Sequence, residues 1–483
     1  MSVVKFIKVD EVYCSVQTDY TTFLELCEEL SFEIPNKKFH PLVQSGNWDG
    51  FIRLINKMNK LMYSGLIDHT AKIATDSGHE VEIDHAYAEN PYSVSEAEDF
   101  IKSLNVPHAP HDFQESAFIH SIQKQRALIL SPTSSGKSFL MYLIIMALGL
   151  RTIIIVPSTG LIKQLTKEFQ AYGYPGKIHW VMQGTEKSDP EAMLTISTWQ
   201  SIYKEPKKYF NQYEVLLGDE VHKFDSKCLK TLMEKTVNTP YKIGVTGSLN
   251  GTKTHELVLT GLFGPVYETI TTREMIDRGI ASEINIKVML FSYPPEDLKC
   301  LKVVRSYEDE LQFIMAHPLR NKFIKNLAES LPGNGIILFR RVEAHGKIIK
   351  DMLETSGKKQ VYYIHGKVNS DDREDIRQFA EAENGVIVLA SDGTTSTGIS
   401  IKNIQWMMKV NPLKSVINNV QSMGRGLRLD EKDNKLTYYD LGDELNQARA
   451  KPKGYLFDHL AERLKIYVKS KFPFKIYKIR LER

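Results

Sequence analysis

The sequence is poor in cysteine and has no long apolar run. Its four cysteines, Cys14, Cys27, Cys228 and Cys300, lie far apart and form no CxxC pair. This spacing excludes a disulfide framework and a cysteine metal site, and it predicts free thiols in a reducing compartment. No apolar run approaches the roughly 20 residues of a membrane span, and the start, MSVVKFIKVDEVY, lacks the apolar core of a signal peptide. We expect a soluble cytoplasmic protein with no membrane partner.

The chain also lacks an excess of either charge, since 62 Lys and Arg against 59 Asp and Glu leave a net charge of +3. Total charge therefore neither requires nor excludes a nucleic-acid partner, which has to be argued from local features. With 42% hydrophobic and 25% charged residues, the composition is that of an ordinary globular protein.

Two repeated patterns divide the chain. Its 483 residues suggest roughly three domains at about 150 residues each. Short apolar runs alternate with helical patterns from about residue 110 and again from about residue 334, which predicts two α/β lobes with parallel sheets. We expect a small α+β DNA-binding module over 1–105, a first lobe over 106–282, a second lobe over 283–450, and a basic C-terminal helix or tail over 451–483.

The first lobe holds a candidate phosphate loop that lacks the first glycine of the pattern GxxxxGK[ST]. The stretch SPTSSGKS, residues 131–138, follows the strand-like RALIL and precedes an apolar helical pattern. A strand, a tight loop and a helix N-terminus present backbone N–H groups to phosphates. Serine tolerates positive φ less well than glycine, but the donors are backbone groups, so we still expect phosphate binding. The alternative is a plain serine-rich loop at a helix start.

Within this loop Lys137 is placed to pair with the β- and γ-phosphates of ATP, and the Ser138 hydroxyl is placed to bind Mg²⁺. The predicted nucleotide-binding residues of the loop are Pro132, Thr133, Ser134, Ser135, Gly136, Lys137 and Ser138.

An acidic turn follows a later strand pattern in YEVLLGDEVH, residues 213–222. Asp219 is placed to hold Mg²⁺, and Glu220 is placed to orient and deprotonate the attacking water. An acidic turn after a strand is common by itself, but the phosphate loop upstream favours the catalytic interpretation.

The second lobe has no phosphate loop of its own but carries QSMGRGLR, residues 421–428. Arg425 and Arg428 are three apart and share a face of a helix. They are candidate arginine fingers that stabilise charge in the transition state. The alternative is a solvated basic helix start.

In this order, the motifs resemble those of superfamily 2 helicases. SPTSSGKS, DEVH, TGS and QSMGRGLR look like motifs I, II, III and VI, and HDFQESA, VPSTGLIKQ, STWQS, IILF and SDGTTSTGIS fit the others. The resemblance implies that Gln114 reads adenine, with His111 and Phe113 as stacking partners, and that Gly398 of motif V lies at the nucleotide. It also implies four residues that couple the nucleotide state to the nucleic-acid grip: His222, Thr246, Ser248 and Gln421.

A narrower resemblance is to the UvsW-type phage helicases, through GNWDGFIRL, TSSGKS, STWQS, SLNGTKT, HPLRNKFI and DLGDE. It implies two RecA-like lobes behind a small module. It also implies an ATP-dependent helicase for Holliday junctions, forks, D-loops and R-loops, acting in recombination, repair and replication control. The implied partners are branched or single-stranded DNA and RNA in R-loops. The enzyme is expected to be a monomer in the host cytoplasm, with a single-strand-binding protein as an accessory.

A motor that moves along any sequence needs contacts to the nucleic-acid backbone rather than to base edges. The candidates share positions just after strand-like runs or in the glycine-rich turn of the module; they are Ser158, Thr159, Thr198, Trp199, Gln200, Arg340, His365, Lys367, Trp48 and Arg53. For both tryptophans the alternative is a packed core aromatic.

Other functions remain open at this stage. Within motors, the chain could be a duplex translocase or an RNA helicase that does not unwind branched DNA, or the motor subunit of a restriction complex. In another class, it could be an ATP-gated DNA-binding adaptor. Glu220 and the two arginines argue against a pure switch, which has no need of a hydrolytic centre.

Overall fold

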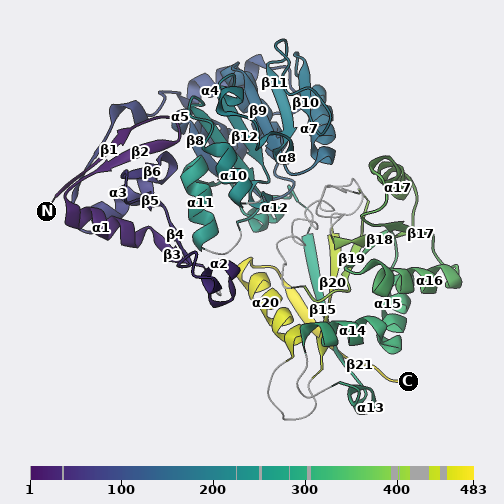
Figure 1. The fold of residues 1–483 in the computed structure, drawn as a ribbon. Coiled ribbons are helices and arrows are strands. Elements are labelled where there is room, and N and C mark those ends of the chain that lie inside the picture. The colour runs from purple at the N-terminus through teal and green to yellow at the C-terminus, as the bar shows by residue number, and fades with distance from the viewer. Residues whose placement is uncertain are drawn as a thin grey trace. The chain divides into compact units, whose positions relative to one another are not determined.

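The computed structural model describes residues 2–34, 37–224, 226–249, 253–281, 283–301, 306–392, 401, 403–413, 435–445 and 454–483. The chain forms two compact units, Met1–Ile270 and Thr271–Arg483 (Figure 1). Of the helices in these ranges, none is both long and apolar enough to cross a membrane.

The first unit begins with a small module built on a mixed sheet of order β5-β6-β2-β1-β7. Strands β1 (Val3–Lys8) and β2 (Tyr13–Gln17) are antiparallel, whereas β1 and β7 (Glu80–Ile83) are parallel. The sheet continues through β6 (Leu61–Tyr63) and β5 (Ile55–Asn56). Alternate residues of β1 and β2 are buried in the core of the module, namely Val4, Phe6, Cys14 and Val16. The module also contains α1 (Tyr20–Glu29), β3 (Ser31–Glu33), α2 (Pro41–Gln44), β4 (Phe51–Arg53) and α3 (Ile67–Asp76), and α4 (Val94–Ser103) follows it.

The first lobe is a seven-stranded parallel sheet of order β10-β11-β9-β12-β13-β8-β14. Its strands are β8 (Arg126–Leu130), β9 (Thr152–Val156), β10 (Ile178–Val181), β11 (Leu194–Thr198), β12 (Val215–Asp219), β13 (Tyr241–Thr246) and β14 (Val266–Glu268). Helices α5 (Asp112–Lys124), α6 (Lys137–Leu148) and α7 (Thr159–Ala171) cover one face. The other face is covered by α8 (Trp199–Ile202), α9 (Lys207–Phe210), α10 (Ser226–Met233) and α11 (Lys253–Phe263).

The module packs on the first lobe at the starts of β8 and β13, and α11 contacts both parts (Figure 1). Arg126 and Lys242 are neighbours across these strands, and both donate to the backbone carbonyl of Glu11. The Glu11 carboxylate also lies 3.3 Å from the Arg126 guanidinium. Burial lowers the pKa of Lys242 well below its usual value, and the neighbouring Arg126 adds to this. The module thus supplies the hydrogen-bond acceptor for two buried basic side chains of the first lobe.

The second unit is built on another seven-stranded parallel sheet, of order β17-β18-β16-β19-β20-β15-β21. Its strands are β15 (Glu283–Ser292), β16 (Gly335–Phe339), β17 (Val361–Ile364), β18 (Ile387–Ser391), β19 (Trp406–Lys409), β20 (Lys435–Glu444) and β21 (Phe474–Arg480). Its longer helices are α14 (Tyr307–Ala316), α15 (Pro318–Ser330), α16 (Lys347–Ser356), α17 (Ser370–Ala382) and α20 (Tyr455–Lys469).

The predicted fold class, two parallel α/β lobes behind a small α+β module, is confirmed. The stretch expected as a basic C-terminal helix or tail forms α20 and the edge strand β21, which pairs with β15 along Ile286–Ser292. Its apolar side chains Leu460, Tyr467 and Phe472 are buried in the core of the second sheet. That burial ties the stretch to the lobe.

Candidate nucleotide site and nucleic-acid interface

The phosphate loop links β8 to α6 as predicted, and its serines hydrogen-bond to one another. The Ser131 and Ser135 hydroxyls lie 2.6 Å apart, and the Ser135 hydroxyl also donates to the Pro132 carbonyl at 2.7 Å. The Thr269 hydroxyl donates to Ser131 Oγ at 2.9 Å. Ser131, which stands where the pattern has glycine, therefore joins Ser135 of the loop to Thr269, which follows β14. Thr269 was missed by sequence reasoning because it belongs to no motif and lies 138 residues away.

Two residues of the loop take the left-handed conformation, Ser134 at φ +68° and Gly136 at φ +79°. For serine this conformation costs about 1–2 kcal/mol. Gly136 is required for a second reason, since a Cβ there would lie 2.2 Å from Gln114 Nε2. The backbone is thus bent as a phosphate loop needs.

Gln114, on the first turn of α5, is buried and clamps this bend. Its Nε2 donates to the Ser135 carbonyl at 2.7 Å, and its Oε1 accepts from the His111 backbone N–H at 2.8 Å. The His111 ring stacks on Phe113 at 5.3 Å between centroids. Of the candidate adenine-binding residues, Gln114 therefore contacts the phosphate loop directly, and His111 is held to Gln114 through its backbone.

The acidic turn faces the loop. Asp219 ends β12, and Glu220 follows in the left-handed conformation at φ +51°. Lys137 Nζ lies 3.6 Å from Glu220 Oε1 and donates to the Ser131 carbonyl at 3.4 Å. Lys137 and Glu220 therefore lie side by side at the carboxyl edge of the sheet. Ligands of parallel α/β sheets bind at this edge.

The predicted coupling residues of the first lobe are contiguous with the acidic turn. His222 Nδ1 lies 3.4 Å from Glu220 Oε2 and 2.5 Å from the Thr246 hydroxyl, at the end of β13. The Thr246 hydroxyl donates to the Ser248 carbonyl at 2.9 Å. A chain of polar contacts thus runs from Glu220 to Ser248.

The nucleic-acid candidates of the first lobe lie at the same edge, at the starts of α7 and α8. Ser158 precedes α7 and Thr159 begins it; the Ser158 hydroxyl is buried and has no hydrogen-bond partner within the described ranges. Thr198 ends β11, and its hydroxyl lies 2.8 Å from that of Ser201. Trp199 is half-buried beside Tyr203, and Gln200 is exposed.

In the second unit, Arg340 follows β16 and donates to the Tyr307 hydroxyl at 3.2 Å. His365 and Lys367 follow β17, so all three lie at the carboxyl edge of the second sheet. The predicted residues Gly398, Gln421, Arg425 and Arg428 lie outside the described residues.

In the module, the two candidates have internal partners. The Trp48 indole donates to the Phe51 carbonyl at 3.1 Å and packs edge-on against His40. Arg53 forms an exposed ion pair with Asp49. The most exposed large apolar side chains of this module are Met58, at 96%, Phe39, at 78%, and Tyr20, at 72%; Phe39 and Met58 each follow a lysine in the sequence.

Comparisons with known proteins agree with this geometry. Residues 3–84 match the family described as "DNA helicase UvsW, N-terminal", residues 89–250 match "Type III restriction enzyme, res subunit", and residues 319–430 match "Helicase conserved C-terminal domain". The crystal structure of T4 UvsW superposes with a TM-score of 0.52 at 28% identity, covering 99% of this chain and 100% of that chain. A type ISP restriction-modification enzyme, LlaBIII bound to DNA, shares the fold alone, with a TM-score of 0.56 at 12% identity over 78% of this chain and 32% of that chain.

The predicted resemblance is confirmed by sequence as well. The chain is 30% identical over 501 aligned positions to the ATP-dependent DNA helicase uvsW of Enterobacteria phage T4, covering 98% of each chain. Because this likeness runs through the N-terminal module and both lobes, the chain belongs to the UvsW family of ATP-dependent DNA helicases.

Proposed function

We propose that the chain uses ATP hydrolysis to unwind or branch-migrate branched DNA, in Holliday junctions, forks, D-loops and R-loops, during recombination, repair and replication control. One observation carries this proposal. The phosphate loop, the acidic turn and the starts of α7 and α8 share one edge of the first sheet, behind a module of the UvsW type. A nucleotide and a nucleic-acid strand would therefore be read by adjacent turns of one rigid sheet.

In this proposal Lys137 and the loop N–H groups bind the phosphates, and Gln114 and His111 bind adenine. The hydroxyl of Ser138 and the carboxylate of Asp219 are hard oxygen donors, the kind that Mg²⁺ takes together with substrate phosphates. When bound, Mg²⁺ neutralises phosphate charge. Glu220 accepts the proton of the attacking water. As ATP binds, Lys137 exchanges its long contact with Glu220 for phosphate oxygens, which frees the carboxylate for this role.

The second lobe supplies Arg425 and Arg428 to the transition state and Gly398 to the nucleotide. His222, Thr246, Ser248 and Gln421 transmit the nucleotide state to the strand. Ser158, Thr159, Thr198, Trp199 and Gln200 grip the backbone in the first lobe, and Arg340, His365 and Lys367 do so in the second. In the module, Trp48 and Arg53 contact the strand, and the exposed Phe39 and Met58 offer apolar surface to unpaired bases.

The partners in this proposal are branched and single-stranded DNA, and RNA where the substrate is an R-loop. The enzyme acts as a monomer, with a single-strand-binding protein covering the released strand, in the cytoplasm of the host if a phage encodes it.

The test is one panel at fixed salt: single strand, blunt duplex, fork, four-way junction and R-loop, each assayed for ATPase rate and strand separation. Separation of the fork, junction and R-loop, but not the blunt duplex, supports the proposal. ATPase stimulated by duplex without separation would mean a translocase. Unwinding of RNA duplexes alone would mean an RNA helicase. ATP-dependent binding without turnover would mean an adaptor.

A further inference from the structure

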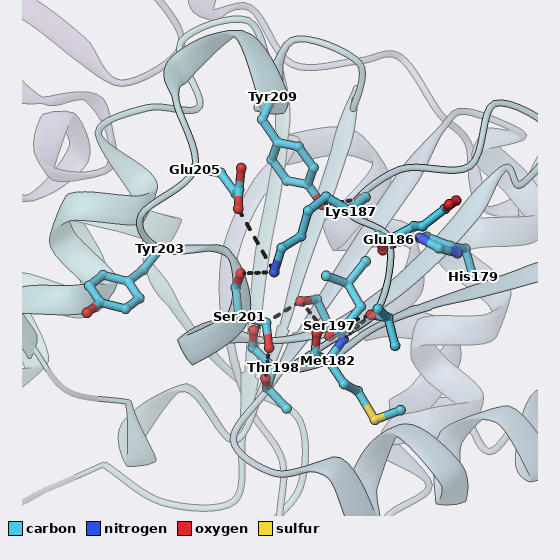
Figure 2. Close-up of polar contacts among 12 residues, drawn as sticks. His179, Met182, Glu186, Lys187, Ser197, Thr198, Ser201, Tyr203, Glu205 and Tyr209 are labelled. Carbon is cyan, nitrogen blue, oxygen red and sulfur yellow. Dashed lines mark hydrogen bonds and ion pairs between the residues drawn. The ribbon is translucent and has the colours of Figure 1, made fainter.

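The loop between β10 and β11 folds over α8, the short turn that carries Trp199 and Gln200 (Figure 2). Lys187, from this loop, donates through Nζ to the Ser201 carbonyl at 2.8 Å and lies 3.9 Å from Glu205 Oε1. The Tyr209 hydroxyl donates in turn to the Lys187 carbonyl at 3.0 Å. Lys187 thus binds the segment that follows Ser201 through its side chain, and Tyr209 through its backbone carbonyl.

A second lysine holds the same segment from another side. Lys235, beyond α10, donates to the Tyr203 and Glu205 carbonyls, each at 2.7 Å. Together, Lys187 and Lys235 satisfy three carbonyls between residues 201 and 205.

These contacts matter because α8 has only four residues, Trp199–Ile202. So short a helix is unstable by itself, and its last carbonyls have no partner within it. Cations at a helix C-terminus stabilise it. The hydroxyls of Ser201 and Thr198 lie 2.8 Å apart and share a hydrogen bond. A shift of Ser201 would therefore also move Thr198, at the start of the turn.

We propose that Lys187 and Lys235 are positioning residues that set the strand grip of the turn Thr198–Gln200 without touching DNA themselves. This inference rests on the proposed function, in which that turn contacts the backbone. Both ammonium groups are engaged with carbonyls of the protein, so the cations shape the turn rather than offering charge to a phosphate.

The test is the ATPase rate of the full chain as a function of single-stranded DNA concentration. Lys187→Met should raise the DNA concentration for half-maximal stimulation about tenfold, because one charge-assisted hydrogen bond is lost. The maximal rate, the KM for ATP and the melting temperature should change little. Lys187→Arg, which keeps a donor, should restore most of the affinity. The control is Lys177→Met on the edge of the same region; Lys177 pairs with Asp189 and Glu191 and should be neutral.

Two further measurements separate positioning from direct contact. A direct phosphate contact would lower the slope of log affinity against log salt by about 0.7 for a single strand in Lys187→Met, whereas a positioning residue leaves that slope unchanged. In a Trp199→Ala background, Lys187→Met should have a much smaller effect, because the two act through one turn. Equal effects in both backgrounds, or a reduced salt slope, would overturn the inference.

If Lys187→Met proves unstable, Tyr209→Phe removes only the hydroxyl that holds the Lys187 carbonyl. It should also raise the DNA concentration for half-maximal stimulation, but by a smaller factor. An unchanged value would count against the role of the loop between β10 and β11. If Trp199→Ala and Thr198→Ala leave DNA stimulation unchanged, the proposed strand path fails. If they weaken it while Lys187→Met does not, only the positioning role fails.

Discussion

The two lobes bury charge in different ways. At the nucleotide edge of the first lobe, Lys137 and Glu220 approach only to 3.6 Å, and His222 and Glu220 to 3.4 Å. In the second unit, Arg320 binds Asp443 through two hydrogen bonds of 2.8 and 3.0 Å with both side chains fully buried. Arg463 and Asp440 form a similar pair at 2.8 Å.

The pairs of the second unit also have protein partners for several of their other atoms, although Arg320 Nη1 and Asp440 Oδ1 are buried without a hydrogen-bond partner in the part of the chain that the structure describes. Asp443 accepts from the Tyr293 hydroxyl at 2.5 Å, and Arg320 donates to the Val410 carbonyl at 2.9 Å. Burial lowers the pKa of Arg320, but Asp443 and Tyr293 together outweigh burial and hold that pKa above its usual value. A pair with two short, fully buried hydrogen bonds stabilises the fold. In the proposed mechanism, the longer contacts of the first lobe are exchanged for contacts to the nucleotide.

The largest effect is expected at Glu220, which makes the longer contacts of the first lobe. Glu220→Gln should lower the ATP turnover rate by about 10²- to 10⁴-fold, because the general base is lost. ATP affinity and melting temperature should stay near wild type. Phosphate release and nucleotide titration measure the two quantities. The exposed Glu191→Gln is the control, and normal turnover in Glu220→Gln would refute the assigned role.

In the second unit, Arg320→Met should destabilise the fold by about 3–5 kcal/mol, because it leaves Asp443 buried and unpaired. Urea denaturation measures the loss. The matched control is Arg273→Met on α12 (Thr272–Asp277), whose ion pair with Asp277 has a contact of 2.7 Å but is exposed. That change should cost less than about 1 kcal/mol. Equal losses in the free energy of unfolding would show that burial does not determine how much an ion pair contributes to stability.

A sharper comparison concerns the loop itself. Ser131→Gly restores the glycine of the phosphate-loop pattern, yet it should raise the KM for ATP several-fold, up to about tenfold, because the hydroxyl bonds to Ser135 and Thr269 are lost. Ser131→Ala should behave alike if the hydroxyl is what matters. A lower KM in the glycine variant would mean that backbone freedom outweighs the hydrogen bonds.

The smallest effect is a pH dependence in the second unit. Burial, with the nearby Arg320 charge, lowers the pKa of His345 to about 3. The unfolded chain takes up this proton below about pH 6.5 while the folded chain does not, so its contribution to stability is complete above that pH and falls as pH drops toward 3. Between pH 7 and 5.5 the loss should be about 1 kcal/mol. Urea titrations of wild type and His345→Leu should differ by that amount; identical pH slopes would contradict it.

Much of the nucleotide site could be predicted because the residues within each of its motifs are close in sequence. The loop from Ser131 to Ser138 and the turn Asp219–Glu220 each follow an apolar strand, and a parallel sheet brings such ends together. Trp48 and Arg53 were singled out by residue type alone, which does not show that each already has a partner within a few residues.

The sequence by itself determined the two α/β lobes, the small module, the phosphate loop and the acidic turn, because periodicity and turn chemistry act between neighbours in the chain. Only the tertiary structure decided which side chains from distant parts of the chain contact one another. Arg320 reaches Asp443 over 123 residues, Thr269 reaches Ser131 over 138, and Lys187 reaches the Ser201 carbonyl from another loop. Such contacts depend on the order of strands in a sheet and on burial.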